Sequence, residues 1–92
     1  MVRTLGTEPD PARRLRQKQG GKLKEYRTKF RRLSLRQLAE LMNAQPGISV
    51  TPQSIGMWES GRMTPRPHMQ VAICRALDVM PSAIFGLDQE VA

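Results

Sequence analysis

The sequence of 92 residues is poor in cysteine and histidine, with Cys74 and His68 as the only examples. A single cysteine excludes an intramolecular disulfide, and the two side chains are too few for a structural zinc site. Neither has a partner at a spacing typical of nucleophilic catalysis, so we interpret Cys74 as a small buried apolar residue. The sequence therefore predicts neither an enzyme nor a cofactor site, and it suits a reducing compartment.

Long apolar runs are also missing. None approaches the about 18 residues that a membrane-spanning helix needs. The N-terminal residues lack the apolar core of a secretory signal. We therefore expect a soluble, cytoplasmic protein with no membrane partner, and its length leaves room for one small domain.

Acidic residues are scarce in the first part of the chain. The sequence has 15 Lys and Arg against 8 Asp and Glu, for a net charge of +7. Residues 1–36 hold twelve basic and three acidic side chains, whereas the rest of the chain nets −2. This density favours a nucleic acid as partner, because basic side chains that neutralise phosphates release condensed counterions. A solvated basic face without a ligand is the alternative.

Residues 1–20 have few large apolar side chains, so we expect a flexible basic arm there. Asp10 as N-cap and Pro11 at the first helical position would start a short helix over residues 11–19. Gly20 would then lie just beyond its end.

From residue 22 onward the sequence has helical periodicity. Apolar residues at steps of three and four predict a helix over residues 22–32: Leu23, Tyr26, Phe30 and Leu33. Ser34 and Gln37 have the spacing of a capping box and start a second helix. This helix must end near Asn43, because Pro46 and Gly47 form a turn signal.

Thr51 followed by Pro52 predicts the start of a third helix, over residues 52–60. Threonine is a favoured N-cap, and proline at the first helical position loses no hydrogen bond. Ile55 and Trp58 are expected to face the core. Gly61 can take the left-handed conformation that ends a helix.

Two further helices are expected, one opening at Pro67 and one after Pro81. Their inner faces are assigned to these residues: Val71, Cys74, Leu77, Ile84 and Phe85. No stretch alternates apolar and polar residues with period two, so we expect no sheet. The prediction is an all-α fold, with a compact five-helix domain over residues 21–87 and a tail over residues 88–92.

The second and third helices carry the most specific pattern. Two short helices joined by a turn, with the second helix exposed, form the geometry that places a helix in the DNA major groove. A spaced set of residues resembles the lambda-repressor-like helix-turn-helix family of phage repressors, Cro proteins and XRE-type regulators: Leu38, Ala39, Glu40, Ile55, Trp58, Glu59, Ser60, Gly61, Arg62, Pro65, Ala76, Leu77, Asp78 and Val79. The resemblance covers about residues 23–87. It implies a sequence-specific transcriptional regulator, in the simplest case a repressor, that binds double-stranded DNA.

The resemblance implies that the third helix reads bases through its exposed residues: Thr51, Pro52, Gln53, Ser54 and Met57. Glutamine can pair bidentately with adenine, and Pro52 and Met57 can contact a thymine methyl group. Gly56 lets the helix backbone approach the DNA closely. The resemblance also gives Glu59 a structural role at the end of this helix.

Phosphate contacts are assigned to the tip of the second helix and to the loop after the third: Ser34, Arg36, Arg62 and Arg66. Basic residues of the arm are further candidates, because arms can follow the DNA backbone or enter the minor groove: Arg13, Arg14, Arg16 and Lys18. Three features depart from the family pattern. Leu35 replaces a frequent glutamine, Arg31 and Arg32 lie where glycine commonly ends the first helix, and the turn over residues 44–49 is enlarged.

A homodimer is expected, because paired modules read two half-sites about 34 Å apart. Spare apolar residues near the C-terminus are candidates for its interface: Met80, Leu87 and Val91. Two alternatives stay open. The fold also suits a protein-interaction module, such as an antitoxin or a small adaptor with a protein partner, and the basic arm suits nonspecific coating of nucleic acid.

Overall fold

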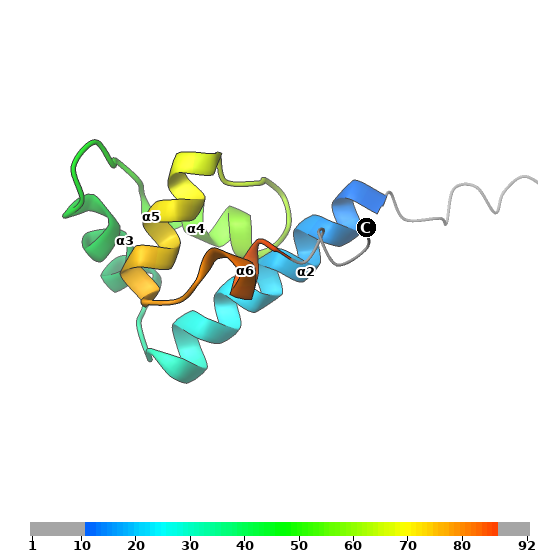
Figure 1. Ribbon diagram of the computed structural model, residues 1–92, viewed down its shortest axis with the longest axis horizontal. Helices are drawn as coiled ribbons and strands as arrows, with labels where there is room; N and C mark the ends of the chain where they lie inside the picture. The colour runs from blue at the N-terminus through cyan, green and yellow to red at the C-terminus, as the bar shows by residue number, and fades with distance from the viewer. Residues whose placement is uncertain (1–10, 87–92) are drawn as a thin grey trace, which may run out of the picture.

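The longest helix, α2 (Pro11–Glu25), continues directly into a π-helical segment, η1 (Tyr26–Phe30). Four further helices follow along the chain: α3 (Leu35–Asn43), α4 (Pro52–Glu59), α5 (Pro67–Leu77) and α6 (Pro81–Ile84). The computed structural model describes residues 11–86. Expectations for residues 1–10 and 87–92, including Leu87 and Val91, lie outside the described part. The predicted all-α, five-helix fold is confirmed (Figure 1).

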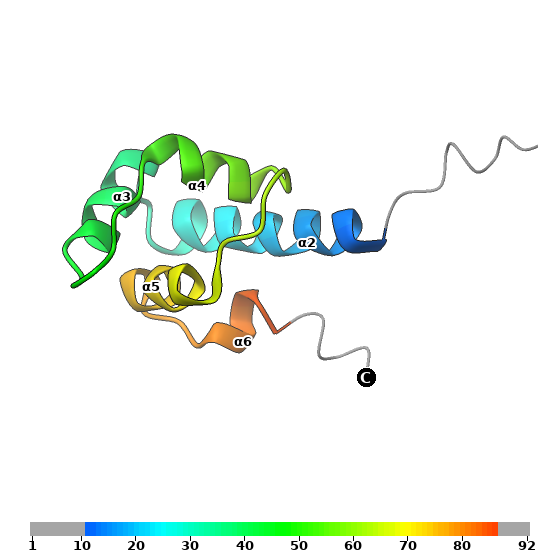
Figure 2. The same ribbon diagram turned by 90° about the horizontal axis from the view of Figure 1, so that it is seen from above.

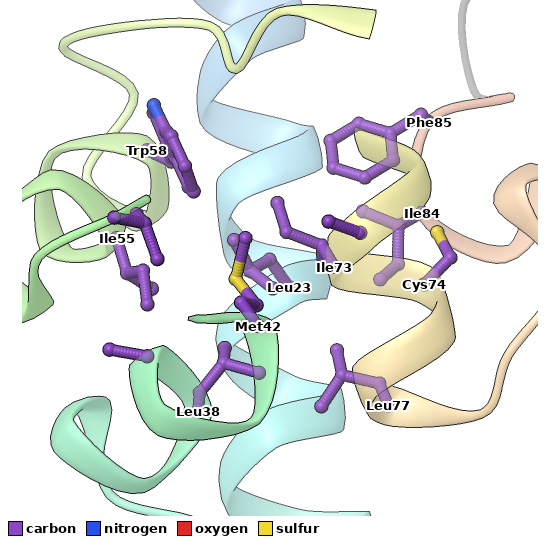
Figure 3. Packing of buried hydrophobic residues seen from close by; sticks show 13 residues of the cluster. Leu23, Leu38, Met42, Ile55, Trp58, Ile73, Cys74, Leu77, Ile84 and Phe85 are labelled. Atoms are coloured by element: carbon purple, nitrogen blue, oxygen red, sulfur yellow. The ribbon is translucent and has the colours of Figure 1, made fainter. Parts of the chain in front are cut away.

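The core forms around α2. In Figure 2, α4 lies on one side of this helix, and α5 and α6 lie on the other. Side chains from all five helices converge near Leu23 (Figure 3). The largest side chains that are fully buried are all aliphatic or Met: Leu23, Leu38, Met42, Ile55, Ile73, Leu77 and Ile84.

Cys74 is buried in this core, as the sequence predicted. Burial raises the pKa of its thiol above the ordinary value, because desolvation disfavours the thiolate. The thiol therefore stays protonated at neutral pH and behaves as a small apolar side chain.

The predicted helix starts are confirmed by their hydrogen bonds. Ser34 Oγ accepts from the Gln37 N–H at 3.0 Å, and Gln37 Oε1 accepts from the Ser34 N–H at 2.8 Å, which completes the capping box. Thr51 caps α4, and Pro52 is its first residue. Gly61 follows α4 with φ at 81°, the left-handed conformation expected there.

The short helix expected over residues 11–19 does not end at Gly20 as predicted, because α2 runs through Gly20 and Gly21. The reason lies in the packing of α2 against α4. A Cβ at Gly20 would lie 2.5 Å from the carbonyl oxygen of Glu59 and closer still to that of Trp58. Glycine thus lets two backbones approach, and this packing offsets its low helix propensity. Residues 11–19 are helical from Pro11 onward, as expected of the short helix within the basic arm, and Gln19 and Gly20 are buried.

Phe30, which belongs to the apolar spacing that predicted the helix over residues 22–32, is 63% exposed, and Val71, expected on the inner face of its helix, is 44% exposed. At Phe30 the cause is the π-helical turn, in which the Arg31 N–H donates to Tyr26 O, five residues back. This wider turn moves Phe30 away from the inner face of the helix. In its exposed position the Phe30 ring packs against the Tyr26 ring. Val71 is two residues before the buried Ile73, which is a rotation of about 200° around the helix axis. Val71 therefore faces away from the core.

The same π-helical segment places Arg27 inside the protein. Its Nε and one terminal nitrogen donate to the two carboxylate oxygens of Glu59 at 2.6 and 3.0 Å. Its other terminal nitrogen donates to Leu33 O at 2.7 Å. Because both side chains are more than nine-tenths buried, this bidentate pair fixes the end of α4 relative to η1 and the start of α3. Glu59 has the structural role that the resemblance implied.

The left-handed turn that ends the first helix is made by Arg32, with φ at 54°. This conformation is the one for which glycine is favoured. The departure from the family pattern at this position therefore concerns the residue type, since the chain still makes the turn.

We expect Gly20→Ala to destabilise the protein, because the new methyl group would overlap backbone atoms of α4. Gly21→Ala is the matched control, since a Cβ there meets nothing within 4 Å. It should raise the free energy of unfolding by up to about 1 kcal/mol through helix propensity. Urea unfolding of both variants measures the difference, and equal effects would contradict the close approach of α2 and α4.

Arg27→Met should lower the free energy of unfolding by about 3–5 kcal/mol, because it leaves the buried Glu59 carboxylate without a partner. The double variant Arg27→Met, Glu59→Leu should recover much of this loss, since both charges are removed. Glu25→Gln, which breaks the exposed pair with Lys22, serves as the control and should cost less than about 1 kcal/mol. Additive losses in the double variant would show that the two side chains do not act as a pair.

Candidate nucleic-acid interface

Helix α4 is held to the core by one face. Ile55 and Trp58 are buried on that face, as predicted. On the remaining surface, Thr51, Gln53 and Met57 are exposed, and Pro52 and Ser54 are partly exposed. The structure therefore places all five residues assigned to base reading along the solvent-facing side of α4, with Thr51 as its N-cap.

Thr51 and Ser54 use part of their hydrogen-bonding capacity to cap the start of α4. Thr51 Oγ1 accepts from the Ser54 N–H at 3.2 Å, and its hydroxyl donates to Ser54 Oγ at 3.1 Å. The Ser54 hydroxyl can still donate its proton outward. The side chain of Gln53 forms no hydrogen bond within residues 11–86, so its amide oxygen and its amide nitrogen both remain available.

The tip of α3 lies beside α4, and it is the first of two places where phosphate contacts were predicted. Ser34 and Arg36 are exposed there. The N–H groups of Leu35 and Arg36 find no acceptor within residues 11–86, as is usual in the first turn of a helix. Unpaired N–H groups at a helix start favour an anion.

Leu35, which replaces a frequent polar residue of the family, is partly buried against the core. A Cβ at Gly56 of α4 would contact its Cδ1 atom at 3.8 Å. Leu35 therefore packs between α3 and α4. The donors that remain at this tip are the backbone N–H groups, the Ser34 hydroxyl, the Gln37 side-chain amide and Arg36.

The loop after α4 is the second predicted place of phosphate contact. Arg62 and Arg66 are both exposed, and neither takes part in an ion pair within residues 11–86. The Arg62 N–H donates to Met57 O at 3.0 Å, which fixes the loop backbone against α4. The two predicted phosphate sites thus lie at different ends of the α3–α4 unit (Figure 2).

The enlarged turn between α3 and α4 is fastened at both ends. Asn43 Nδ2 donates to Val50 O at 2.9 Å, and Asn43 Oδ1 accepts from the Val50 N–H at 2.7 Å. Gln45 Nε2 donates to Ala72 O at 2.8 Å, which ties the turn to α5. These contacts set where α4 begins. They were not predicted from the sequence, although an asparagine at a helix end often forms side-chain hydrogen bonds to the backbone.

The basic residues assigned to a flexible arm lie on α2. Arg13, Arg14 and Lys18 are exposed, and Arg16 is half-buried. Arg16 Nε donates to Gly61 O at 3.1 Å, directly after α4. Within residues 11–18 these cations are therefore carried by the short helix that was expected from Pro11, and only Arg16 is bonded to another part of the domain.

Other kinds of site find little support in the described residues. Between residues 11 and 86 no three His, Cys, Asp or Glu side chains gather as metal ligands would. None of the helices in that range has the length and apolar character needed to cross a membrane.

A helix-turn-helix family model matches residues 23–83, about two-thirds of the chain. The match includes α3, α4, the turn between them and α5. Comparisons with curated proteins and with solved structures give no match. The family match agrees with the order of the helices and with the capped, exposed α4. The chain belongs to the XRE or lambda-repressor-like helix-turn-helix family of DNA-binding regulators.

Proposed function

We propose that the protein is a sequence-specific regulator of transcription that binds double-stranded DNA with α4 in the major groove. The observation that carries this proposal is the exposed Gln53 side-chain amide, which forms no hydrogen bond with any group within residues 11–86. A glutamine in this position can pair with both N6 and N7 of an adenine. Ser54 and Met57 follow it along the same helix surface.

Contacts to the phosphate backbone would orient this helix. The free N–H groups at the tip of α3, together with Ser34 and Arg36, suit one DNA strand. Arg62 and Arg66 suit the backbone beyond the other end of α4. Such contacts carry no sequence information but fix the register in which Gln53 meets the bases.

Electrostatics supports the same orientation. Glu59 is the only carboxylate of α4 and the loop up to Arg66, and Arg27 neutralises it inside the protein. The exposed surface of α4 is therefore uncharged, and the exposed cations beside it are Arg36, Arg62 and Arg66. We infer that the protein acts at the nucleoid as a repressor, by covering DNA that the transcription machinery needs.

We also propose that two copies bind one operator. A single module of this kind offers few base contacts, whereas a two-fold pair reads two half-sites one helical turn apart. Met80, before α6, is the most exposed large apolar side chain within residues 11–86, at 72%. It lies on the C-terminal part that we assign to the dimer interface.

Selection of bound duplexes from a random library tests the proposed function. The full chain should enrich a defined sequence, and Gln53→Ala should lose preference at one base pair with about a 5- to 150-fold loss of affinity. Val71→Ala is the control, because Val71 is exposed on α5 and not on α4. Absence of any enriched sequence would contradict the proposal and would favour a protein partner for this fold.

Sedimentation of the full chain with its selected duplex tests the dimer. We expect two chains per duplex and an inverted repeat with half-sites about ten base pairs apart. Met80→Lys should weaken this complex, because a charge would be placed in the interface. One chain per duplex at saturating protein would refute the dimer.

A further inference from the structure

The first three turns of α2 lie outside the part of the chain that the family model matches, which begins at residue 23. They are nevertheless built into the domain. Arg16 bonds to Gly61 O, and a Cβ at Gly61 would lie 2.5 Å from Cγ of Gln17. Gln19 Nε2 donates to Phe85 O at 3.5 Å. This extension of the helix-turn-helix domain is therefore held against the C-terminal end of α4.

A groove lies where the extension meets the loop after α4. It is lined by these residues: Arg13, Arg16, Ser60, Gly61 and Arg62. Three of the five carry a guanidinium group, and none of the three forms an ion pair within residues 11–86. Three close cations without a counter-charge repel one another, and an anion bound among them would relieve that repulsion.

The donors in this groove are the guanidinium groups. Ser60 donates its hydroxyl proton to Met57 O at 3.1 Å, and the Gly61 N–H donates to Trp58 O at 3.2 Å. Arg16 uses only its Nε for Gly61, so its two terminal nitrogens remain available. Planar guanidinium groups match the oxygens of a phosphate, which they bind in a bidentate manner.

The position of the groove at the C-terminal end of α4 indicates which kind of phosphate it would bind. Its members Ser60, Gly61 and Arg62 directly follow the last residue of α4. If α4 lies in the major groove, the DNA backbone that borders it passes this end of the helix. We propose that Arg13, Arg16 and Arg62 together bind one phosphate diester of the DNA backbone, flanking the base pairs that α4 reads. This inference rests on the proposed function and extends the contact surface beyond the family-matched domain.

Duplexes carrying a single uncharged methylphosphonate test the proposal. The full chain should bind the selected duplex about tenfold more weakly when one flanking phosphate is neutralised. Arg13→Gln and Arg62→Gln should each lose this sensitivity at the same position. Each should also reduce the slope of log K against log salt, by at most about 0.9, because the three side chains share one phosphate. Both residues are exposed, so the variants should keep the thermal unfolding temperature of the parent, whereas Arg16 is left intact because of its bond to Gly61.

Lys29→Gln is the control, because it removes the same charge from an exposed position on η1 outside the groove. It should keep the methylphosphonate sensitivity. If the Arg13 and Arg62 variants keep it as well, the groove does not bind phosphate, although enrichment of a sequence would still support the proposed function. If no sequence is enriched, salt slopes on a random duplex decide. A larger reduction for Arg13→Gln and Arg62→Gln than for Lys29→Gln supports the groove, and equal reductions overturn it.

Discussion

The buried pair between Arg27 and Glu59 joins the three segments that make this domain a helix-turn-helix unit. One guanidinium group reaches the last residue of α4 and the backbone of Leu33, just before α3. Removing two charges from water costs several kcal/mol, and three short hydrogen bonds of the guanidinium group offset that cost. In return, the far end of α4 has one position relative to the rest of the fold. The same contact hides the only carboxylate of α4 from an approaching polyanion.

The other contacts of α4 divide it into a fixed part and an available part. Its C-terminal end lies against Gly20, where two backbones meet, and against the Arg16 side chain. Its start is set by the Asn43 clamp on Val50 and by the Thr51 cap. What remains for a ligand is the solvent-facing surface with Gln53 and Met57. Rigid placement of such a surface lowers the entropic cost of binding.

Features governed by neighbours in sequence could be predicted from the sequence. The Ser34 capping box, the Thr51 cap and the burial of Ile55 and Trp58 depend on local spacing, and the structure confirms them. Gly20 was misinterpreted because its role comes from α4, which lies far along the chain. The spacing of Leu23, Tyr26 and Phe30 assumes a regular helix, whereas the π-helical segment buries Arg27 and leaves Phe30 exposed. The residues assigned to DNA could be named from the family pattern, but their contacts with DNA depend on a partner outside the chain.

We propose that the exposed side of α4 contacts DNA bases, whereas α5 contacts none. Amide and side-chain NMR shifts of the full chain, titrated with its selected duplex, test this claim most directly. We expect the largest changes at the Gln53 side-chain amide and at the N–H groups of Leu35 and Arg36. Small changes at α4 together with large ones at exposed residues of α5, such as Val71 and Arg75, would contradict it.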